Sequence, residues 1–261
     1  MEKKTPLRTV LFLTHPLLQV PSYLCKPSVP SFLHRVAPWT KVIFILRNPV
    51  DRAHSAWKME FNTPRGNKTK TRTGKPKVSG FRYHVAEEVR RLHRFQWVDM
   101  PTLQSFLAAP SVARVQNHTV PLTLAERHQA VYATNKNGNT TNKFHRKLQC
   151  GHIGRGMYAQ QLMGWLRYYT LHDNLLVLRY EDFLANRTLV LEQLHRFVGL
   201  ADPRVTVGEE RLETTYRPRA SLDRRKGTMG DVMRDYLTEL YRPFNRELAD
   251  LLGEEWRGVW D

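Results

Sequence analysis

The stretch KVIFILRNPVDRAHSAW, residues 41–57, decides the fold class. Its first half contains VIFIL, a continuous β-branched and aromatic run that is typical of a strand buried on both faces in a parallel sheet. Asn48 and Pro49 then break the run, and an amphipathic helical pattern follows. Asn48 or Asp51 can cap that helix, and Pro49 suits its first turn. The stretch therefore predicts a strand at 41–47 that turns sharply into a helix.

Two arginines and a serine surround this turn. Arg47 ends the predicted strand, whereas Arg52 and Ser55 fall in the helix. Ligands of parallel α/β folds bind beyond the carboxyl ends of the strands, and a helix N-terminus offers free N–H groups and a positive dipole end. An arginine adds a bidentate fork for phosphate oxygens and a serine adds a hydroxyl donor. The turn is therefore predicted to hold a phosphate, and an ordinary ion pair between Arg47 and Asp51 is the alternative.

The rest of the chain alternates between helical and strand patterns. NLLVLRY at 174–180 is a second buried strand, which predicts an α/β fold with a parallel central sheet flanked by helices. Polar loops are expected at 62–80 and 135–156. No internal repeat or domain boundary is visible, so 1–261 is expected to form a single domain. Helices are predicted at 22–36, 83–96, 102–109, 121–134, 157–171, 181–200 (ending at Gly199) and 231–252, where Pro243 is expected to kink or divide the last one.

The composition indicates a folded and strongly basic protein. Hydrophobic residues make up 41% of the 261 residues, which suffices for a sizeable core, and the net charge is +17. Such an excess predicts an anionic partner, namely nucleic acid, an acidic polysaccharide, a phosphate-rich cofactor or a membrane surface, and a basic surface without a single partner is the alternative. Cys25 and Cys150 permit one disulfide, and the sequence does not say whether they meet. No metal is expected, because neither a zinc spacing nor a histidine cluster is present.

Four Asn-X-Ser/Thr sequons favour passage through a secretory lumen, where such asparagines accept glycans. The sequons begin at Asn67, Asn117, Asn139 and Asn186. The apolar stretch VLFLTHPLLQV, residues 10–20, is too short to span a bilayer, and His15 and Pro16 interrupt it.

The segment ILRNPVDRAHSAW, residues 45–57, resembles the 3′-phosphate-binding segment of sulfotransferases that use 3′-phosphoadenosine 5′-phosphosulfate (PAPS). The heparan sulfate and related carbohydrate sulfotransferases are the closest branch. The resemblance implies a P-loop-like sulfotransferase fold in which Arg47 and Ser55 contact the 3′-phosphate of the donor. Residues 20–49 also resemble the family's stretch that leads from a TP-x-Y motif into this strand.

Two later segments extend the resemblance. CGHIGRGMYAQQLMGWLRYYTLHDNLLVLRYEDFL, residues 150–184, resembles the family's G-x-Y-x-x-x-L-x-x-W helix and the strand that follows it. RRKGTMGDVMRDYLTELYRPFNRELADLLG, residues 224–253, resembles its late Lys-Gly loop and terminal Tyr-x-x-x-Asn helix. The resemblance covers residues 20–256, interrupted by a variable, basic, insertion-like region at 60–150.

The late loop is implied to fold over the donor nucleotide, which adds Lys226, Gly227 and Thr228 to the expected binding residues. A lysine beside a flexible glycine can approach a phosphate closely, although a plain solvated loop has the same composition. A remnant of a P-loop is disfavoured, because no buried strand precedes these residues. Tyr158 and Trp165 share one helix face, and such aromatics are more often core residues than ligand contacts.

The family's 5′-phosphosulfate loop has no counterpart in this chain. Gln19 stands where the aligned segment of the family carries a lysine. The family's general base lies upstream of the same region, so no catalytic base or catalytic lysine is assigned. We therefore expect either a fold that is incomplete at its N-terminus or a degenerate relative.

The resemblance implies transfer of a sulfonyl group from PAPS to a hydroxyl or amine of a carbohydrate, such as a glycosaminoglycan. An acidic or neutral glycan is the expected acceptor, in the Golgi lumen or at its membrane, with membrane attachment only through a segment outside this chain. The alternative is a non-catalytic basic domain that binds polyanions or nucleic acid. Nucleic acid is not expected, because no interleaved aromatic and basic stripe is present, and a kinase is disfavoured by the absence of G-x-x-x-x-G-K-[ST].

Overall fold

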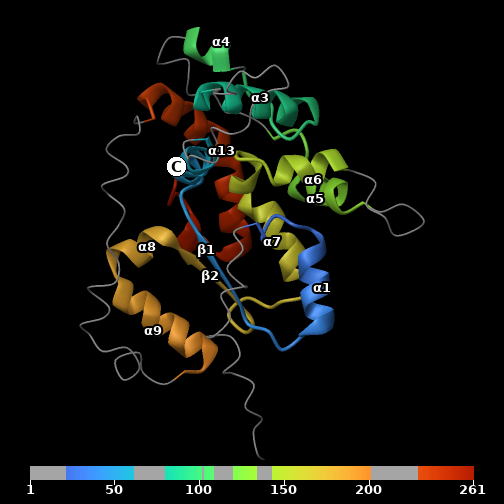
Figure 1. The fold of residues 1–261 in the computed structure, drawn as a ribbon, viewed down its shortest axis with the longest axis vertical. Helices are drawn as coiled ribbons and strands as arrows, with labels where there is room; N and C mark the ends of the chain where they lie inside the picture. Colours follow the sequence, from blue (N-terminus) through green and yellow to red (C-terminus); the bar gives the residue numbers. More distant parts are fainter. Residues whose placement is uncertain (1–21, 62–79, 102, 109–119, 134–142, 201–228) are drawn as a thin grey trace, which may run out of the picture.

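The computed structural model describes residues 22–61, 80–101, 103–108, 120–133, 143–200 and 229–261. Within these ranges, helices surround a short parallel sheet (Figure 1). The sheet consists of β1 (Val42–Leu46) and β2 (Leu175–Arg179), which pair in register from Val42 opposite Leu175 to Leu46 opposite Arg179. Both predicted strands and their parallel pairing are therefore confirmed.

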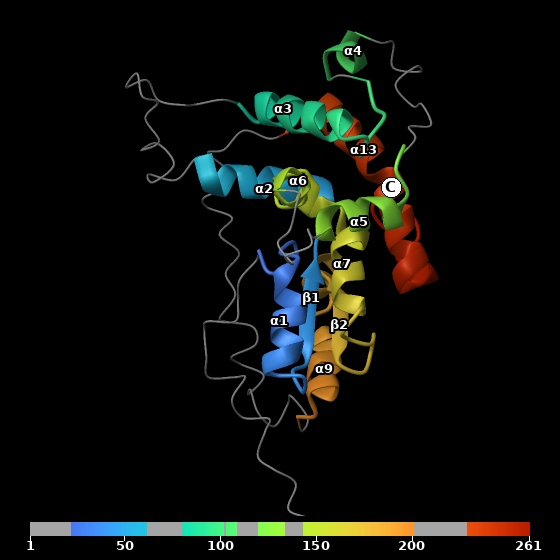
Figure 2. The ribbon, with the colours of Figure 1, turned by 90° about the vertical axis from the view of Figure 1, so that its right-hand side faces the viewer.

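Helices cover both faces of this sheet, as expected for an α/β layered fold (Figures 1 and 2). Successive side chains of β2 point in opposite directions. Leu176 packs on one side against Val190 of α9, and Leu175 packs on the other side against Trp165 of α7. β1 is less completely covered than its sequence predicts, since Ile45 is half exposed.

The helices follow one another along the chain as α1 (Ser28–Val36), α2 (Pro49–Phe61), α3 (Phe81–Arg94), α4 (Leu103–Ala108), α5 (Leu124–Tyr132), α6 (Lys143–Gln149), α7 (Tyr158–Leu166), α8 (Tyr180–Ala185), α9 (Arg187–Val198) and α13 (Asp231–Leu252), with 3-10 turns η5 (Gly154–Gly156) and η6 (Glu254–Trp256). None of the helices in the described ranges is long and apolar enough to cross a membrane.

A larger core lies beyond the carboxyl end of β1, where α13 crosses the helices of the first half of the chain (Figure 2). It contains fully buried aromatic side chains, among them Trp97, Phe106 and Tyr241. Burying such side chains contributes roughly 1.5–3 kcal/mol each. This core holds α2 and α13 together. Because α2 begins at the carboxyl end of β1, the core also positions the end of the sheet where ligands of parallel α/β folds bind.

Several of the sequence predictions were wrong in detail. The helices predicted at 22–36 and 157–171 are shorter, because α1 begins at Ser28 and α7 ends at Leu166. Residues 135–156 are not a continuous loop, because α6 and η5 form within them; the polar composition hid a helix that buries His145 and Leu148. Residues 181–200 form two helices rather than one. Asn186 divides them, because its side chain accepts a hydrogen bond from the Leu189 N–H (3.1 Å) and starts α9 anew.

The predicted end of α9 is confirmed. Gly199 ends α9 with a left-handed backbone (φ 78°), for which glycine carries no steric penalty. Pro243 was expected to kink or divide the last helix, but it lies inside α13 and does not divide it. The neighbouring Tyr241 and Phe244 are buried in the large core, so packing outweighs the helical hydrogen bond that proline cannot donate.

The two cysteines form a disulfide, with Sγ atoms 2.15 Å apart and Cα atoms 5.4 Å apart. Cys25 precedes α1, and Cys150 follows α6. The bond therefore ties the described N-terminal segment to the part of the chain that leads into η5.

Candidate functional site

The β1–α2 turn lies at the carboxyl end of the sheet, where the sequence predicted it. Asn48 caps α2, because its Oδ1 accepts hydrogen bonds from the N–H groups of Val50 (2.9 Å) and Asp51 (3.4 Å). Of the two predicted caps, Asn48 is therefore the one used, and Pro49 occupies the first helical position as expected.

The N–H groups of this helix end are not free, contrary to the expectation from the sequence. Those of Val50 and Asp51 point to the Asn48 side chain, and the N–H of Asn48 donates to Glu181 Oε1 (2.8 Å). Pro49 has no N–H group. An anion at this turn would consequently be bound by side chains rather than by backbone N–H groups. Arg47 and its neighbours are the side chains in question.

Arg47 lies between groups that come from other elements. Its guanidinium lies over the Tyr180 ring, 5.2 Å from the ring centroid, and its backbone carbonyl accepts a hydrogen bond from the Tyr158 hydroxyl (2.7 Å). Burial raises the pKa of Tyr158 to about 12, so the hydroxyl remains a donor at neutral pH. Both contacts hold Arg47 at the end of β1.

The alternative ion pair between Arg47 and Asp51 does not form. Asp51 instead pairs with Arg234 of α13, with 2.8 Å between its carboxylate and the guanidinium. None of the carboxylates in the described ranges pairs with the Arg47 guanidinium. The charge of Arg47 is therefore available to an anionic ligand. Ser55, the other predicted phosphate contact, lies half-buried further along α2.

Arg52 is used differently, because its guanidinium donates to the carbonyl oxygen of His152. His152 in turn lies 3.0 Å from a carboxylate oxygen of Glu60. Arg52 thus joins α2 to the segment that leads into η5. Arg155 of η5 lies near Arg52, and burial together with that second positive charge lowers the pKa of Arg155.

The segment around η5 is held by a buried carboxylate and by two close backbone approaches. Glu88 of α3 accepts hydrogen bonds from the N–H groups of Ile153 (2.8 Å) and Gly154 (3.0 Å), and burial raises the pKa of its carboxyl. A Cβ on Gly154 would lie 1.8 Å from the Leu148 carbonyl oxygen. A Cβ on Gly156 would lie 2.7 Å from the Tyr241 ring, so only glycine fits either position.

The remaining predicted site residues have different outcomes. Lys226, Gly227 and Thr228 lie outside the described residues, so they stay predictions. Tyr158 and Trp165 are both buried, as expected for core aromatics. Tyr158 has the additional contact to Arg47 described above.

Sequence reasoning missed Tyr180 and Glu181, which follow β2 directly. The signal was present, because the carboxyl ends of paired parallel strands meet at one edge of a sheet. Residues at the end of the second predicted strand, 174–180, and directly after it were therefore candidates for the same site as Arg47. Their specific contacts, to a guanidinium and to a backbone N–H, are visible only in three dimensions.

Comparison with known proteins identifies the class to which this fold and turn belong. Residues 28–228 match the family model of the sulfotransferase domain, so the chain belongs to the sulfotransferase domain family. This match confirms the family resemblance found in the sequence.

Among curated proteins, the chain is similar to carbohydrate sulfotransferase 15 of Homo sapiens, with 31% identity over 103 residues, and of Mus musculus, with 32% identity over 106 residues. Each match covers 38% of this chain and 18% of the relative. The chain therefore matches less than a fifth of the length of these relatives. Among solved structures, it is similar to a sulfotransferase from Alicyclobacillus acidocaldarius, with a TM-score of 0.48 and 18% identity, over 90% of this chain and 64% of that one.

Proposed function

We propose that this chain belongs to an enzyme that transfers a sulfonyl group from PAPS to a hydroxyl or amine of a carbohydrate. The S–O bond to the donor's 5′-phosphate breaks as a bond to the acceptor oxygen or nitrogen forms, and the acceptor gives up its proton. The other product is 3′,5′-ADP. Catalysis of this kind depends mainly on positioning and on stabilising charge.

One observation carries the proposal, namely that the Arg47 guanidinium lies at the carboxyl end of β1 and pairs with no carboxylate of the described residues. In a chain of this family, that position suits the 3′-phosphate of the donor. A bidentate pair between the guanidinium and two phosphate oxygens fits the chemistry of both groups. We assign Ser55 to the same phosphate, and Lys226, Gly227 and Thr228 to the donor nucleotide by family resemblance. We assign no catalytic base.

A glycan is the proposed acceptor, because the curated relatives are named carbohydrate sulfotransferases. The net charge of +17 favours an acidic chain such as heparan sulfate or another glycosaminoglycan. The same charge supports the second candidate function, a non-catalytic domain that binds polyanions. The two candidates differ in their requirement for a 3′-phosphorylated nucleotide.

We propose a secretory compartment such as the Golgi lumen. The Cys25–Cys150 disulfide supports it, because disulfides persist in oxidising compartments. Asn186 is exposed and uses only its Oδ1 in the cap of α9, which leaves the amide nitrogen accessible to a glycan. Glycosidase treatment of protein from a secretory host should lower its mass, and an unchanged mass would argue against this compartment.

Calorimetry with 3′,5′-ADP and 5′-AMP tests the donor site. The native chain should bind 3′,5′-ADP more tightly, because 5′-AMP lacks the phosphate assigned to Arg47. A charged hydrogen bond contributes roughly 1.5–3 kcal/mol, so Arg47→Ala should weaken 3′,5′-ADP binding by about one to two decades. Arg90→Ala removes the same charge from the exposed face of α3 and should leave the affinity unchanged. Equal affinities of the native chain for both nucleotides would refute the assignment.

A further inference from the structure

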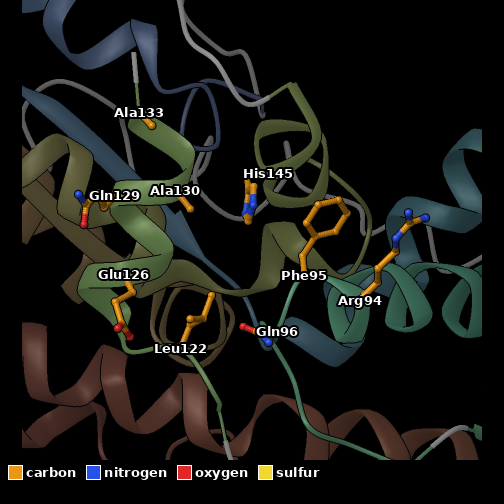
Figure 3. Close-up of a pocket in the computed structure, with 9 residues that line it drawn as sticks. All are labelled: Arg94, Phe95, Gln96, Leu122, Glu126, Gln129, Ala130, Ala133 and His145. Atoms are coloured by element: carbon orange, nitrogen blue, oxygen red, sulfur yellow. The ribbon is translucent and has the colours of Figure 1, made fainter. Parts of the chain in front are cut away.

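A second candidate site lies apart from the β1–α2 turn. A pocket of about 480 Å³ opens between the C-terminal end of α3, helix α5 and helix α6 (Figure 3). Phe95, Gln96, Leu122 and His145 point into its opening from three segments. The volume is in the range of small-molecule binding sites.

Gln96 has a backbone conformation that its residue type disfavours. Its φ is +59°, in the left-handed region. The N–H of Gln96 donates to the His93 carbonyl (2.9 Å), and the N–H of Trp97 donates to the Leu92 carbonyl (2.9 Å), which is the Schellman motif that ends a helix. Glycine is the usual residue at this position, whereas an L-residue such as glutamine has a Cβ and carries a steric cost there. Residues in strained backbone conformations cluster at functional sites, and the Gln96 side chain lines this pocket.

His145 offers the pocket a hydrogen-bond donor with a fixed tautomer. The Trp97 indole can only donate, and its Nε1 donates to His145 Nδ1 (3.0 Å). The proton of the neutral ring therefore lies on Nε2. Burial lowers the pKa of His145, which keeps the ring neutral at physiological pH. The residue is only 8% exposed, and no acceptor for its Nε2–H exists in the described part of the chain.

The chemistry of the pocket suits a sugar residue. The Gln96 amide and the His145 Nε2–H can bond to hydroxyl groups, and the Phe95 ring and Leu122 present apolar surface to the C–H face of a pyranose.

Two charged residues line the pocket. The Glu126 carboxylate accepts hydrogen bonds from the N–H and the hydroxyl of Thr123 at the start of α5. Arg94, at the rim, pairs with no carboxylate of the described residues, so its guanidinium can pair with a carboxylate of the sugar.

The pocket and the turn both lie beyond the carboxyl end of the sheet. In both ribbon views α2, α3, α5 and α6 gather beyond the carboxyl end of β1 (Figures 1 and 2). α6 contacts η5, and η5 contacts α2. A linear glycan could therefore occupy the pocket with one unit while another unit extends towards the turn.

We propose that this pocket binds one uronate-containing unit of the acceptor glycan, remote from the group that receives the sulfonyl. The proposal rests on the proposed function for the choice of ligand. Binding energy from such a remote unit orients the acceptor at the reacting centre.

The variant Gln96→Gly separates binding from folding. Glycine relieves the backbone strain, so the melting temperature should stay the same or rise, while loss of the amide should weaken glycan binding about tenfold. The probes are hexasaccharides of unsulfated chondroitin and of heparosan, measured by calorimetry at about 0.15 M salt to screen long-range attraction. The matched control is His172→Gly, which relieves a similar conformation (φ +66°) outside the pocket and should leave glycan affinity unchanged.

A pair of arginine variants tests the charge at the rim. Arg94→Ala should weaken binding of the hexasaccharides several-fold. Arg91→Ala removes the same charge from an exposed position on α3, where the guanidinium lies near Glu87, and should have little effect. Equal losses in both variants would show attraction by net charge alone and would overturn the proposal.

The remaining outcomes distinguish this proposal from the donor site. Every pocket variant should bind 3′,5′-ADP as tightly as the native chain does. If the native chain binds 3′,5′-ADP but neither hexasaccharide, or if Gln96→Gly leaves glycan affinity unchanged, the pocket assignment is wrong. If the native chain binds a hexasaccharide through Gln96 but shows no preference for 3′,5′-ADP over 5′-AMP, the pocket assignment holds and the donor site is wrong.

Discussion

Reduction of the Cys25–Cys150 disulfide should cost this protein a large share of its stability. The bond joins residues 125 positions apart, and closing a loop of that length in the unfolded chain corresponds to roughly 5 kcal/mol at 25 °C. Domains are typically stable by only about 5–15 kcal/mol in total. The reduced protein should therefore unfold at a much lower urea concentration than the oxidised protein.

Urea unfolding of the oxidised and reduced native chain measures this cost with the same side chains in both states. Cys25 is 1% exposed, so reductant should act slowly on the folded protein, and equilibration with it under partly denaturing conditions is required. The double variant Cys25→Ala/Cys150→Ala should behave like the reduced chain. A difference below about 1 kcal/mol between the free energies of unfolding of oxidised and reduced protein would refute the reasoning, because the expected cost of closing the loop is several times larger.

Reduction should also weaken nucleotide binding. His152 follows Cys150 by two residues, and its carbonyl accepts the hydrogen bond from Arg52 of α2. Loosening this segment should loosen the helix that begins at the β1–α2 turn. Calorimetry with 3′,5′-ADP on reduced protein, under conditions in which it remains folded, should show a several-fold loss of affinity. Undiminished affinity would mean that the turn keeps its shape without the bond.

Three further changes should alter stability in predictable directions. Arg127 is fully buried and pairs with Glu247, so Arg127→Ala should lower the free energy of unfolding in urea by about 3–5 kcal/mol, and a loss below about 1 kcal/mol would contradict this. Burial lowers the pKa of both His128 and His145, so the unfolded chain binds their protons first. The contribution of these two neutral histidines to the free energy of unfolding is complete above about pH 6.5 and falls as the pH drops below it. Urea midpoints measured at a series of pH values should therefore decrease on acidification. Midpoints that rise on acidification would contradict this prediction. Gly156→Ala would place a Cβ 2.7 Å from the Tyr241 ring, so it should destabilise the fold by about 1–3 kcal/mol and weaken 3′,5′-ADP binding, whereas unchanged urea and nucleotide titrations would show that the ring moves aside at no cost.

The sequence predicted the features of the fold that depend on local patterns. The two strands were visible as continuous apolar runs, and the end of α9 was visible as a glycine. The sequence did not reveal the break at Asn186, because the residues on both sides of it form helix well. It also did not reveal α6, because a short helix that buries a histidine and a glutamine looks polar in sequence.

The candidate site was predictable in position but not in its contacts. Arg47 at the end of a buried strand was recognisable from sequence, whereas the occupation of the helix N–H groups was not. Asn48 could be foreseen as a cap because it lies next to the helix. The predicted strand pairing could bring Glu181 near the same turn. Its hydrogen bond from the Asn48 N–H could not be foreseen, because strand pairing does not fix where the side chain of a residue 133 positions away points.

That separation has a consequence for how the protein is made. During synthesis the apolar strand β1 leaves the ribosome long before β2, its parallel partner, and Cys25 precedes Cys150 by 125 residues. Contacts this distant in sequence slow folding, and an unpaired apolar strand is prone to aggregate in the meantime. The nascent chain therefore has to be kept apart from its neighbours, and its first cysteine from wrong partners, until most of the sequence has been translated. Production of this protein should depend on chaperones and on disulfide exchange more than its size alone would suggest.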